Sequence, residues 1–544
     1  MPHGEGPVIL ARAPLDPDPT HCHSVFAVIT RPRKKTSETQ GRTAQRADQY
    51  RILGVLRRSP VGIECLCCGS QVWTSPLGST LLHACAGQDE LHAQGLLTDE
   101  QSEDFVITYR AADVEPHCRL VLQSGSGPCR PLHVMGDITE RSSSLVDPLH
   151  ALLEEHAAKF EQKCVQLQGD GAPLTSKEKL TLKKEYGRQY LKAAWGYMTD
   201  KDKDQSPVLE HPKAWCFKCC GNCPVHPKDL DGRLYMVIGG NTCTSWSSMN
   251  QGRMMWLSPH TVPFVIWIAD VMKQDIAFLI QECVRNFDVD PLVEMLSPKF
   301  FVQRACFSPT HLGIPAHRLR SYVLATNKAY ITVDIPWQLD SLEHLFWRQL
   351  AASADIYFRA PLRFLKKAIK VKEVQQAERE GQDFIIFSPE LTLAAGAQRR
   401  LEDHIDSAKR RGLEFVCANI AQNVEHMLAD RSCPVVLRGS VIWGVSLKTG
   451  SPNRLMTWYE QLGAQGVPVL LSEGHDLSAV VPEALRFKQI FVESRRVVSD
   501  RMGASLAGNG MHLSQVGLSV VVALLGCSVA DTSSTASPSC EGGD

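Results

Sequence analysis

The chain is 544 residues long, carries a formal net charge of −1 and contains 19 cysteines. This length allows two or three domains, and a hydrophobic content of 44% with 22% charged residues excludes a largely disordered chain. The near-zero charge excludes a uniformly basic surface, so any nucleic-acid contact must come from local patches.

Cysteine usage and hydropathy indicate the compartment. We recognise no signal peptide, and the late apolar run Val516–Leu525 is too short to cross a bilayer. The sequence therefore predicts a soluble intracellular protein with free thiols and no membrane contact.

Residues 1–75 form a basic, poorly patterned N-terminal extension. Its basic run, Arg31-Pro-Arg-Lys-Lys35, is typical of a solvated flexible arm. The alternative is a nuclear localisation signal or a DNA-contacting tail. This alternative predicts a nuclear location. Cys65, Cys67 and Cys68 lack a second cysteine pair close by, so we assign them no role.

A strand is predicted over Phe105–Ala111, and two acidic residues follow its end. A carboxylate at this position of an α/β sheet suits the ribose hydroxyls of an adenosine, because it accepts both O–H groups. Asp113 is the better candidate and Glu115 is a close rival. The segment Gly136-Asp137-Ile138-Thr139 is by itself only a turn, but it lies one strand after Asp113.

Residues 145–228 look like an insertion that is helical at first and then rich in cysteine. Up to about Tyr197 the segment is charged, and Leu149, Leu152, Leu153 and His156 recur at helical spacing. The basic run at 177–192, with Arg188 in it, is more typical of a solvated helix face than of a DNA surface.

The cysteine-rich part of this insertion has the spacing of a zinc site. Its candidate ligands are Cys216, Cys219, Cys220, Cys223 and His226. A second ligand pair is missing unless His211 serves, so we favour reduced loop cysteines over zinc and predict no metal ligand.

The most informative stretch is Arg233–Ser247. Leu234–Ile238 is a short apolar run typical of a strand buried on both faces, and Gly239 and Gly240 are expected to end it. Cys243 then lies on a turn beyond the carboxyl end of a strand, where open α/β sheets place reactive groups. Taken alone, Cys243 would be interpreted as a small buried hydrophobic residue.

A helix over Thr261–Gln274 and a strand over Ile276–Ile280 follow. The helix is predicted to be amphipathic, with an apolar face made by Val262, Val265, Ile266, Ala269 and Met272. Glu282 comes at the end of the strand. A helix between two parallel strands places Cys243 and Glu282 on neighbouring carboxyl ends, within reach of one base.

The rest of the chain holds basic residues and three further motifs. Arg318 and Arg320 lead into a strand over Ser321–Ala325. Residues 327–450 carry basic clusters that suit phosphate contacts: Lys366, Lys367, Lys370, Lys372, Arg399, Arg400, Lys409, Arg410 and Arg411. Residues 451–527 contain the segments Arg454–Pro468 and Leu506–His512, the second including Asn509 and leading into an apolar helix. Residues 528–544 are expected to be a disordered tail.

In this order, the segments resemble the motifs of the cytosine-5 DNA methyltransferase family from about residue 80 to 525. The loop Gly-Gly-x-x-Cys-x-x-Trp-Ser around Cys243 is similar to the family's Gly-Pro-Pro-Cys-Gln followed by Phe-Ser. Gly313–Arg320 resembles Gly-Val-Pro-Gln-x-Arg-x-Arg, and Arg454–Pro468 resembles Arg-x-Leu-Thr-x-x-Glu with a later Leu-Gln-Gly-Phe-Pro. Of the family's Phe-x-Gly-x-Gly cofactor loop, the segment Thr80–Gly87 keeps only Gly87. The sequence departs from the pattern at Thr242, Gln281, Cys283 and Ala316.

The resemblance implies a doubly wound, mostly parallel α/β methyltransferase domain over 76–326 and 451–527, with an inserted target-recognition domain at 327–450. It implies the cofactor S-adenosylmethionine, held by Gly87, Asp113, Val114, Asp137, Ile138 and Asn509. It also implies double-stranded DNA as the substrate, with the target cytosine flipped out of the duplex.

The same resemblance implies four catalytic residues. The Cys243 thiolate would add to C6 of the cytosine, and Glu282 would give a proton to N3 and so must keep that proton near neutral pH. Arg318 and Arg320 would hold the base and help stabilise the thiolate. Two alternatives stay open: a cytosine methyltransferase that acts on transfer RNA, and a catalytically silent homologue that only binds nucleic acid.

Overall fold

The structure is a computed structural model, and a nine-stranded sheet lies at its centre. The residues it describes are 61–67, 106–124, 131–169, 173–199, 212–228, 234–241, 243–248, 250, 252–333, 346, 348–350, 352–360, 393–425, 430–447, 453–467, 500–525 and 527–529. Across the sheet the strands follow the order β5 (Gly221–Pro224), β4 (Lys213–Cys216), β3 (His133–Met135), β2 (Val106–Asp113), β1 (Val61–Cys67), β6 (Leu234–Gly240), β7 (Phe278–Val284), β9 (Arg320–Asn327) and β8 (Phe300–Phe307).

The five central strands are parallel and doubly wound. β3, β2, β1, β6 and β7 pair in parallel, whereas β9 and β8 at one edge and β4 and β5 at the other pair antiparallel. The chain runs outward from β1 to β3 and then returns to the other side of β1, so the strand order reverses between β1 and β6. That reversal is the switch point at which such sheets bind ligands. The predicted doubly wound α/β class is confirmed, with a sheet that is mixed at both edges.

The central strand β1 corrects the sequence analysis. Val61–Cys67 pairs with both β2 and β6, so these residues belong to the sheet and not to an N-terminal extension that ends at 75. The strand includes Cys65 and Cys67, to which we had assigned no role. The segment 80–87, which contains Gly87, lies outside the described residues, as do residues 1–60 of the basic N-terminal extension.

Helices cover both faces of the sheet. On one face lie α6 (Ser143–Gln168), α7 (Ser176–Thr199), α8 (Thr261–Lys273) and α9 (Asp290–Leu296). On the other lie α5 (Pro116–Ser124), α15 (Trp458–Ala464), α17 (Asp500–Asn509) and α18 (Leu513–Leu525). Side chains of β6 alternate between the two layers: Tyr235 and Val237 pack in the first, Met236 and Ile238 in the second. The prediction of a strand buried on both faces is confirmed, although the strand continues through both glycines.

From Phe264 to Val271, helix α8 is buried on all sides and is not amphipathic as predicted. Phe264, Trp267 and Ile268, which lie off the predicted apolar face, are at most 1% exposed. The reason is the second helix layer: α6 and α7 pack against α8 and cover the surface that would otherwise meet water. A local sequence pattern cannot reveal a layer contributed by an insertion more than sixty residues earlier in the chain.

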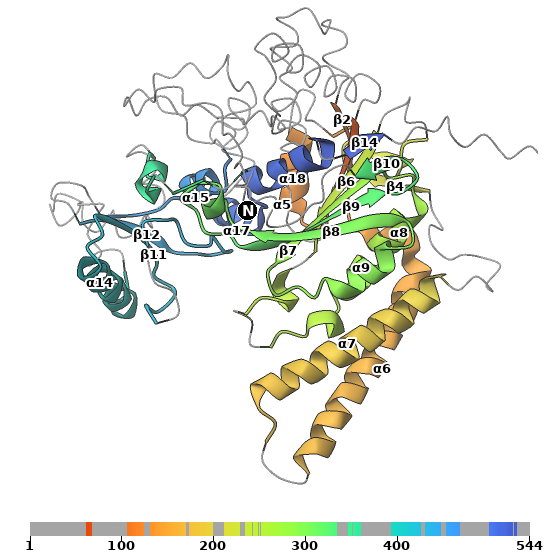
Figure 1. The fold of residues 1–544 in the computed structure, drawn as a ribbon, viewed down its shortest axis with the longest axis horizontal. Helices are drawn as coiled ribbons and strands as arrows, with labels where there is room; N and C mark the ends of the chain where they lie inside the picture. The colour runs from red at the N-terminus through yellow and green to blue at the C-terminus, as the bar shows by residue number, and fades with distance from the viewer. Residues whose placement is uncertain are drawn as a thin grey trace, which may run out of the picture.

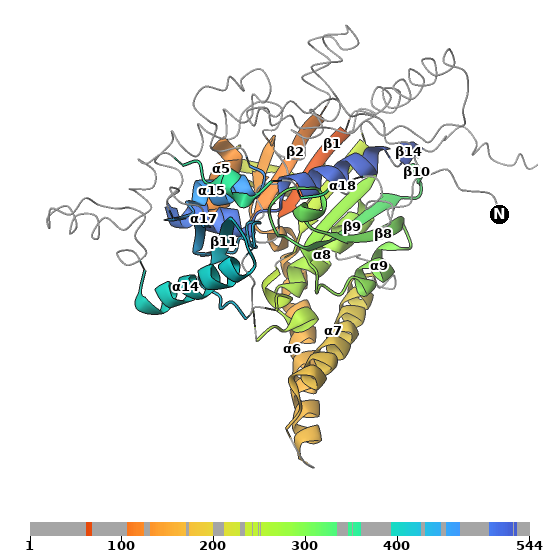
Figure 2. The same ribbon diagram turned by 60° about the vertical axis from the view of Figure 1, so that its left-hand side comes forward.

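The insertion forms a helix pair that projects from the body of the protein (Figures 1 and 2). Its buried face includes Leu149, Leu153 and His156, as their spacing predicted. Near its base, Arg188 is not a freely solvated cation. Its guanidinium donates to Asp288 through Nε at 2.7 Å and Nη2 at 2.6 Å, and Lys184 lies 3.1 Å from the same carboxylate. These bonds attach α7 to the loop that follows β7.

A smaller lobe lies on the opposite side of the molecule from β4 (Figure 1). It consists of α14 (Ala395–Arg410) and an antiparallel sheet of β11 (Phe415–Asn419), β12 (Ile442–Ser446) and β13 (Arg454–Leu455). The sheet extends past residue 450, the predicted boundary of the target-recognition domain. The predicted lysine cluster at 366–372 lies outside the described residues. Of the other predicted basic residues, Arg400 donates to the carbonyl of Ile420 at 2.7 Å.

The segment Arg454–Glu460 joins this lobe to α15. Glu460 is 1% exposed, accepts from Arg454 Nη1 at 2.9 Å and completes a capping box with Thr457 at the start of α15.

The remaining short elements are β10 (Ile331–Val333), which pairs with β14 (Cys527–Val529), and the 3₁₀ turns η1 (Ile138–Ser142), η2 (Cys243–Ser245), η3 (Met255–Leu257), η4 (Pro309–His311) and η5 (Ala354–Tyr357). Within the described ranges, no helix combines the length and hydropathy needed to cross a membrane.

Asp288→Asn should lower the free energy of unfolding by about 1–3 kcal/mol at pH 7, because the charged hydrogen bonds from Arg188 lose their acceptor charge. Burial acts to raise the pKa of Asp288, but the bonds from Arg188 and Lys184 hold it below its usual 3.8. A carboxylate with a lowered folded pKa stabilises the fold above its unfolded pKa, and this stabilisation is lost as the pH falls through the folded value. The difference between wild type and variant should therefore shrink below about pH 4.

Urea unfolding at several pH values measures this difference. Asp290→Asn is the control, because Asp290 also pairs with Arg188 but its side chain is 52% exposed, and it should cost only about 0–1 kcal/mol. Equal losses in the two variants would contradict the assigned role of Asp288.

Candidate active site

The carboxyl ends of the parallel strands meet in one row across the sheet. Cys67 of β1 pairs with Asp113 of β2 on one side and with Gly240 of β6 on the other. Gly240 pairs with Glu282 of β7, which pairs with Tyr322 of β9. Asp113 and Glu282 therefore lie at the same edge, three strand spacings or about 14 Å apart.

Cys243 follows β6 at this edge and begins the turn η2. Its carbonyl accepts from the amides of Trp246 and Ser247 at 3.0 and 2.9 Å, which closes the turn. The thiol is half-buried, in contrast to the completely buried Cys283 on β7. Burial, with the charges of Glu282 and Cys243, raises the pKa of Cys283 well above its usual value. Of these two thiols, Cys243 is therefore the more accessible to a substrate.

A hydrogen bond that sequence reasoning missed joins the Cys243 loop to β7. Gln281 Nε2 donates to Asn241 Oδ1 at 2.7 Å, and both side chains are buried. Gln281 had been noted only as a departure from the family pattern. Its amide crosses to the loop two residues before Cys243, so it fixes the loop relative to the strand that carries Glu282.

Glu282 lies inside β7 and not at its end, and it is paired with Arg320. The carboxylate is 1% exposed, and its Oε1 lies 3.0 Å from Nε of Arg320 at the start of β9. Because β9 is antiparallel to β7, its first residues reach the edge where β6 and β7 end. The topology thus explains how a residue far along the chain meets Glu282.

Arg318 is also buried, near the Glu282 carboxyl group and Arg320. Burial, reinforced by the charge of Arg320, lowers the pKa of Arg318 to about 10, while Glu282 and Cys243 act in the opposite direction. The guanidinium is therefore still charged at neutral pH. Within the described residues its Nε has no hydrogen-bond partner, and Nη1 has only a long contact of 3.4 Å to the carbonyl of Val436. A buried cation with unused donors can bind a polar ligand.

Helix α18 supports the arginine segment from the second face. Gln515 Nε2 donates to the carbonyls of Phe307 and Arg318 at 2.7 and 3.1 Å. His512, just before the helix, is also buried, and burial together with the charge of Arg318 lowers its pKa to about 3. His512 is therefore neutral near pH 7 and cannot serve there as a cationic partner for a base.

The predicted cofactor residues at the end of β2 differ in exposure. Asp113 is completely buried, and its Oδ1 accepts from the amide of Glu115 at 2.8 Å, a local contact that shapes the entry to α5. Glu115 is half-buried, and Val114 is 46% exposed. Glu115 is thus more accessible than Asp113, and Val114 presents an apolar surface beside it.

The other predicted cofactor residues lie near the end of β3 and on α17. Asp137 is half-buried and caps η1 by accepting from the amide of Thr139 at 2.9 Å. Ile138 is 9% exposed and packs into the core that contains α8, instead of standing free at the surface. Asn509 is half-buried at the end of α17, with Nδ2 3.3 Å from Ser505 Oγ.

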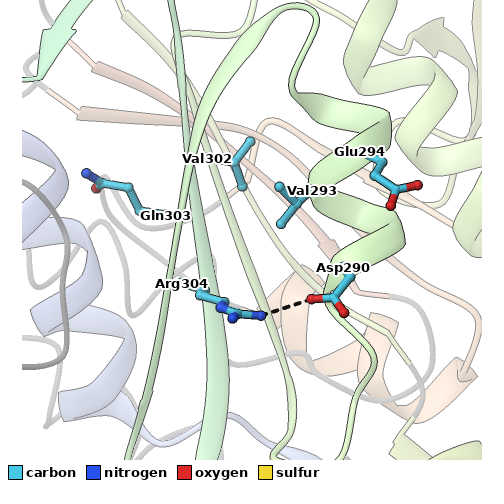
Figure 3. A pocket seen from close by; sticks show the side chains of 6 residues that line it. All are labelled: Asp290, Val293, Glu294, Val302, Gln303 and Arg304. Atoms are coloured by element: carbon cyan, nitrogen blue, oxygen red, sulfur yellow. Dashed lines mark hydrogen bonds and ion pairs between the residues drawn. The ribbon is translucent and has the colours of Figure 1, made fainter.

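A surface hollow of about 350 Å³ lies elsewhere, between α9 and β8 (Figure 3). Arg304 Nη1 lies 3.0 Å from Asp290 Oδ1 at its rim. The lining residues are Asp290, Val293, Glu294, Val302, Gln303 and Arg304, none of which belongs to the predicted site. We assign this hollow no function.

Among known proteins, no family model and no curated protein matches this chain. Similar solved structures include the Dnmt2 methyltransferase of S. pombe, with 11% identity, a TM-score of 0.39 and coverage of 85% of this chain and 98% of that one. A DNMT2 of Spodoptera frugiperda has 11% identity, a TM-score of 0.33 and coverage of 85% and 99%. A putative DNA modification methyltransferase encoded in an E. coli prophage has 11% identity, a TM-score of 0.34 and coverage of 85% and 98%. Identities and TM-scores this low do not show what this chain does.

Arg320→Met should lower the free energy of unfolding by about 3–5 kcal/mol, because it leaves the buried Glu282 carboxylate without its cationic partner. Adding Glu282→Gln should recover part of this loss, because a neutral amide is easier to bury than a charge. The measurement is a double-mutant cycle by urea unfolding, with the exposed Arg285→Met as a control that should change stability by at most about 0.5 kcal/mol. A double variant no more stable than Arg320→Met would count against the ion pair.

Proposed function

We propose that the chain is a divergent cytosine-5 methyltransferase that transfers a methyl group from S-adenosylmethionine to C5 of cytosine in DNA. The observation that carries this proposal is the gathering of Cys243, Glu282, Arg318 and Arg320 at one edge of a doubly wound sheet. A half-buried thiol, a buried carboxyl group and two buried guanidiniums next to a switch point suit nucleophilic chemistry on a polar ring.

The chemistry explains these residue types. Cytosine C5 is too weak a nucleophile to take a methyl group unaided. When a base binds, the Glu282 carboxylate takes up a proton and passes it to N3. With that proton in place, addition of the Cys243 thiolate at C6 converts C5 into an enamine carbon that can attack an electrophile. Loss of the C5 proton to water, with return of the N3 proton to Glu282, then expels the thiolate and restores the aromatic base.

Arg318 and Arg320 act through their positive charges. Arg318 lies close enough to Cys243 for their charges to interact. The unused donor of Arg318 is available to a base oxygen. Arg320 places its positive charge 3.0 Å from Glu282 Oε1. Because the site is buried, each of these interactions is stronger than it would be in water.

The residues at the ends of β2 and β3 fit the adenosine part of S-adenosylmethionine, which when bound supplies the methyl group. Glu115 and Asp137 offer carboxylate acceptors for the ribose hydroxyls and the adenine amine, and Val114 offers an exposed apolar contact for the ring. β6 lies two strand spacings, about 10 Å, from β2. An adenosine bound at β2 is thus within one cofactor length of the Cys243 loop.

We propose DNA as the substrate, with the target base turned out of the duplex to reach this buried edge. The basic residues of α14 that the structure describes, with Lys409 63% exposed, are suitable for phosphate contacts. A nuclear location and an inserted target-recognition domain at 327–450 go with this proposal.

Methyl transfer tests the proposed function. Wild-type protein with labelled S-adenosylmethionine and duplex DNA should form 5-methyldeoxycytidine, detected by mass spectrometry of the digested nucleosides. Cys243→Ser should reduce the rate by more than about 10³-fold, and Glu282→Gln by about 10²–10⁴-fold.

Cys306→Ser, which changes another half-buried cysteine, should leave the rate unchanged. Product on transfer RNA but not on DNA would replace the proposed substrate. No methylated nucleoside from either nucleic acid, with the protein folded and bound to it, would mean a catalytically silent homologue.

A further inference from the structure

Four potential metal ligands converge at the edge of the sheet formed by β3, β4 and β5. They are His133, Cys216, Cys219 and Cys223, and one ligand atom from each lies within 4.8 Å of all the others. None of the four belongs to the candidate active site. Three thiols and one imidazole form a ligand set that tetrahedral zinc prefers.

Two separate chain segments bring these ligands together. Cys216 and Cys223 lie on the hairpin β4–β5, and Cys219 lies on its turn. His133 begins β3, which pairs with β4 through Met135 and Cys216. The amide of Phe217 also donates to the carbonyl of Val134 at 2.7 Å, which fixes the hairpin turn against β3.

We propose that His133, Cys216, Cys219 and Cys223 bind one Zn²⁺ ion, which fastens the β4–β5 hairpin to β3. With Zn–S bonds of about 2.3 Å, tetrahedral ligand atoms lie about 3.8 Å apart, so the observed cluster needs only a small contraction. The distance from Cys219 Sγ to His133 Nδ1 is already 3.6 Å. This inference does not depend on the proposed methyltransferase function.

The surroundings of the cluster hold the ligands in position. The amides of Val134 and Cys219 each lie 3.4 Å from Cys216 Sγ, so they donate to the sulfur and hold it in position. The ring of Tyr109 packs edge-on against the His133 imidazole, with centroids 5.1 Å apart. Groups of this kind set the orientation of metal ligands.

The structure revises the ligand set that the sequence suggested. His226 Nε2 lies 3.0 Å from Asp270 Oδ1 and Nδ1 lies 3.3 Å from the Tyr235 hydroxyl, so this histidine belongs to another network. Cys220 is exposed and its sulfur lies 3.9 Å from the carbonyl of Phe217, outside the cluster. His211 lies outside the described residues. The missing fourth ligand is His133, which comes 86 residues before Cys219.

The proposed site braces the loops that follow β2 and β3. Phe217, on the hairpin turn, packs against Gly136, where an added Cβ would lie 3.1 Å from the ring. The Arg119 guanidinium lies 4.1 Å above the same ring and donates to the carbonyls of Asp113 and Val114 at 3.0 and 2.6 Å. Fixing the hairpin therefore also fixes the positions of Gly136 and Val114.

Metal analysis of the full chain, purified under reducing conditions with zinc in the medium, tests this site. Wild type should contain one zinc per chain by inductively coupled plasma mass spectrometry. Cys219→Ser and Cys223→Ser should each lose most of it. The matched control is Cys220→Ser, on the same turn but outside the cluster, and it should keep the full zinc content. Wild type without zinc, or equal zinc content in all variants, would overturn the proposal.

Cobalt titration keeps the test independent of how well the variants fold. Metal-stripped wild type titrated with Co²⁺ should develop the thiolate charge-transfer and tetrahedral d–d bands of a Cys₃His site, and Zn²⁺ should bleach them. Its melting temperature should rise on adding zinc, because a ligand that binds only the folded state stabilises it. Absence of both the bands and the temperature shift, or a Cys219–Cys223 disulfide in protein purified under reducing conditions, would contradict zinc binding.

Discussion

The buried ion pair between Glu282 and Arg320 is the interaction on which the candidate site depends. Removing two charges from water is costly, and a buried pair persists only with good geometry and with backbone that fixes both partners. Here the sheet provides that backbone, because β9 runs antiparallel to β7 and begins where β6 and β7 end. The strand order thus explains why Arg318 and Arg320 lie beside Glu282, and why the Cys243 turn opens onto the same edge.

Elements remote from this edge of the sheet hold the Glu282–Arg320 pair and the Cys243 turn in place. Gln515 of α18 binds the carbonyl of Arg318 from one face. From the other face, the inserted helix α7 supports the segment after Cys243: Lys183 Nζ donates to the carbonyl of Arg253 at 3.2 Å, and Gly187 packs directly on Trp256. The insertion is therefore part of the scaffold of the site as well as a projection from the surface.

Much of the fold and of the candidate site could be predicted from sequence, because Leu234–Ile238 is continuously apolar and ends next to Cys243. Other features could not. Val61–Cys67 contains a glycine, a glutamate and two cysteines, so it does not resemble a central strand, yet pairing on both sides makes it one. The burial of α8 depends on helices from the insertion, and the choice between Asp113 and Glu115 depends on which carboxylate the fold buries. His133 could not be linked to the cysteines because the sheet, and not the sequence, makes them neighbours.

The central claim is that Cys243 attacks a cytosine, and trapping that bond tests it most directly. Nucleic acid containing 5-fluorocytosine permits thiolate addition and methyl transfer, but it blocks the final elimination because C5 carries no proton to lose. Wild type with S-adenosylmethionine should form a complex with this DNA that survives denaturation, and peptide mass mapping should place the bond on Cys243. A bond mapped to another cysteine, or no covalent complex from protein that still binds the DNA, would contradict the account.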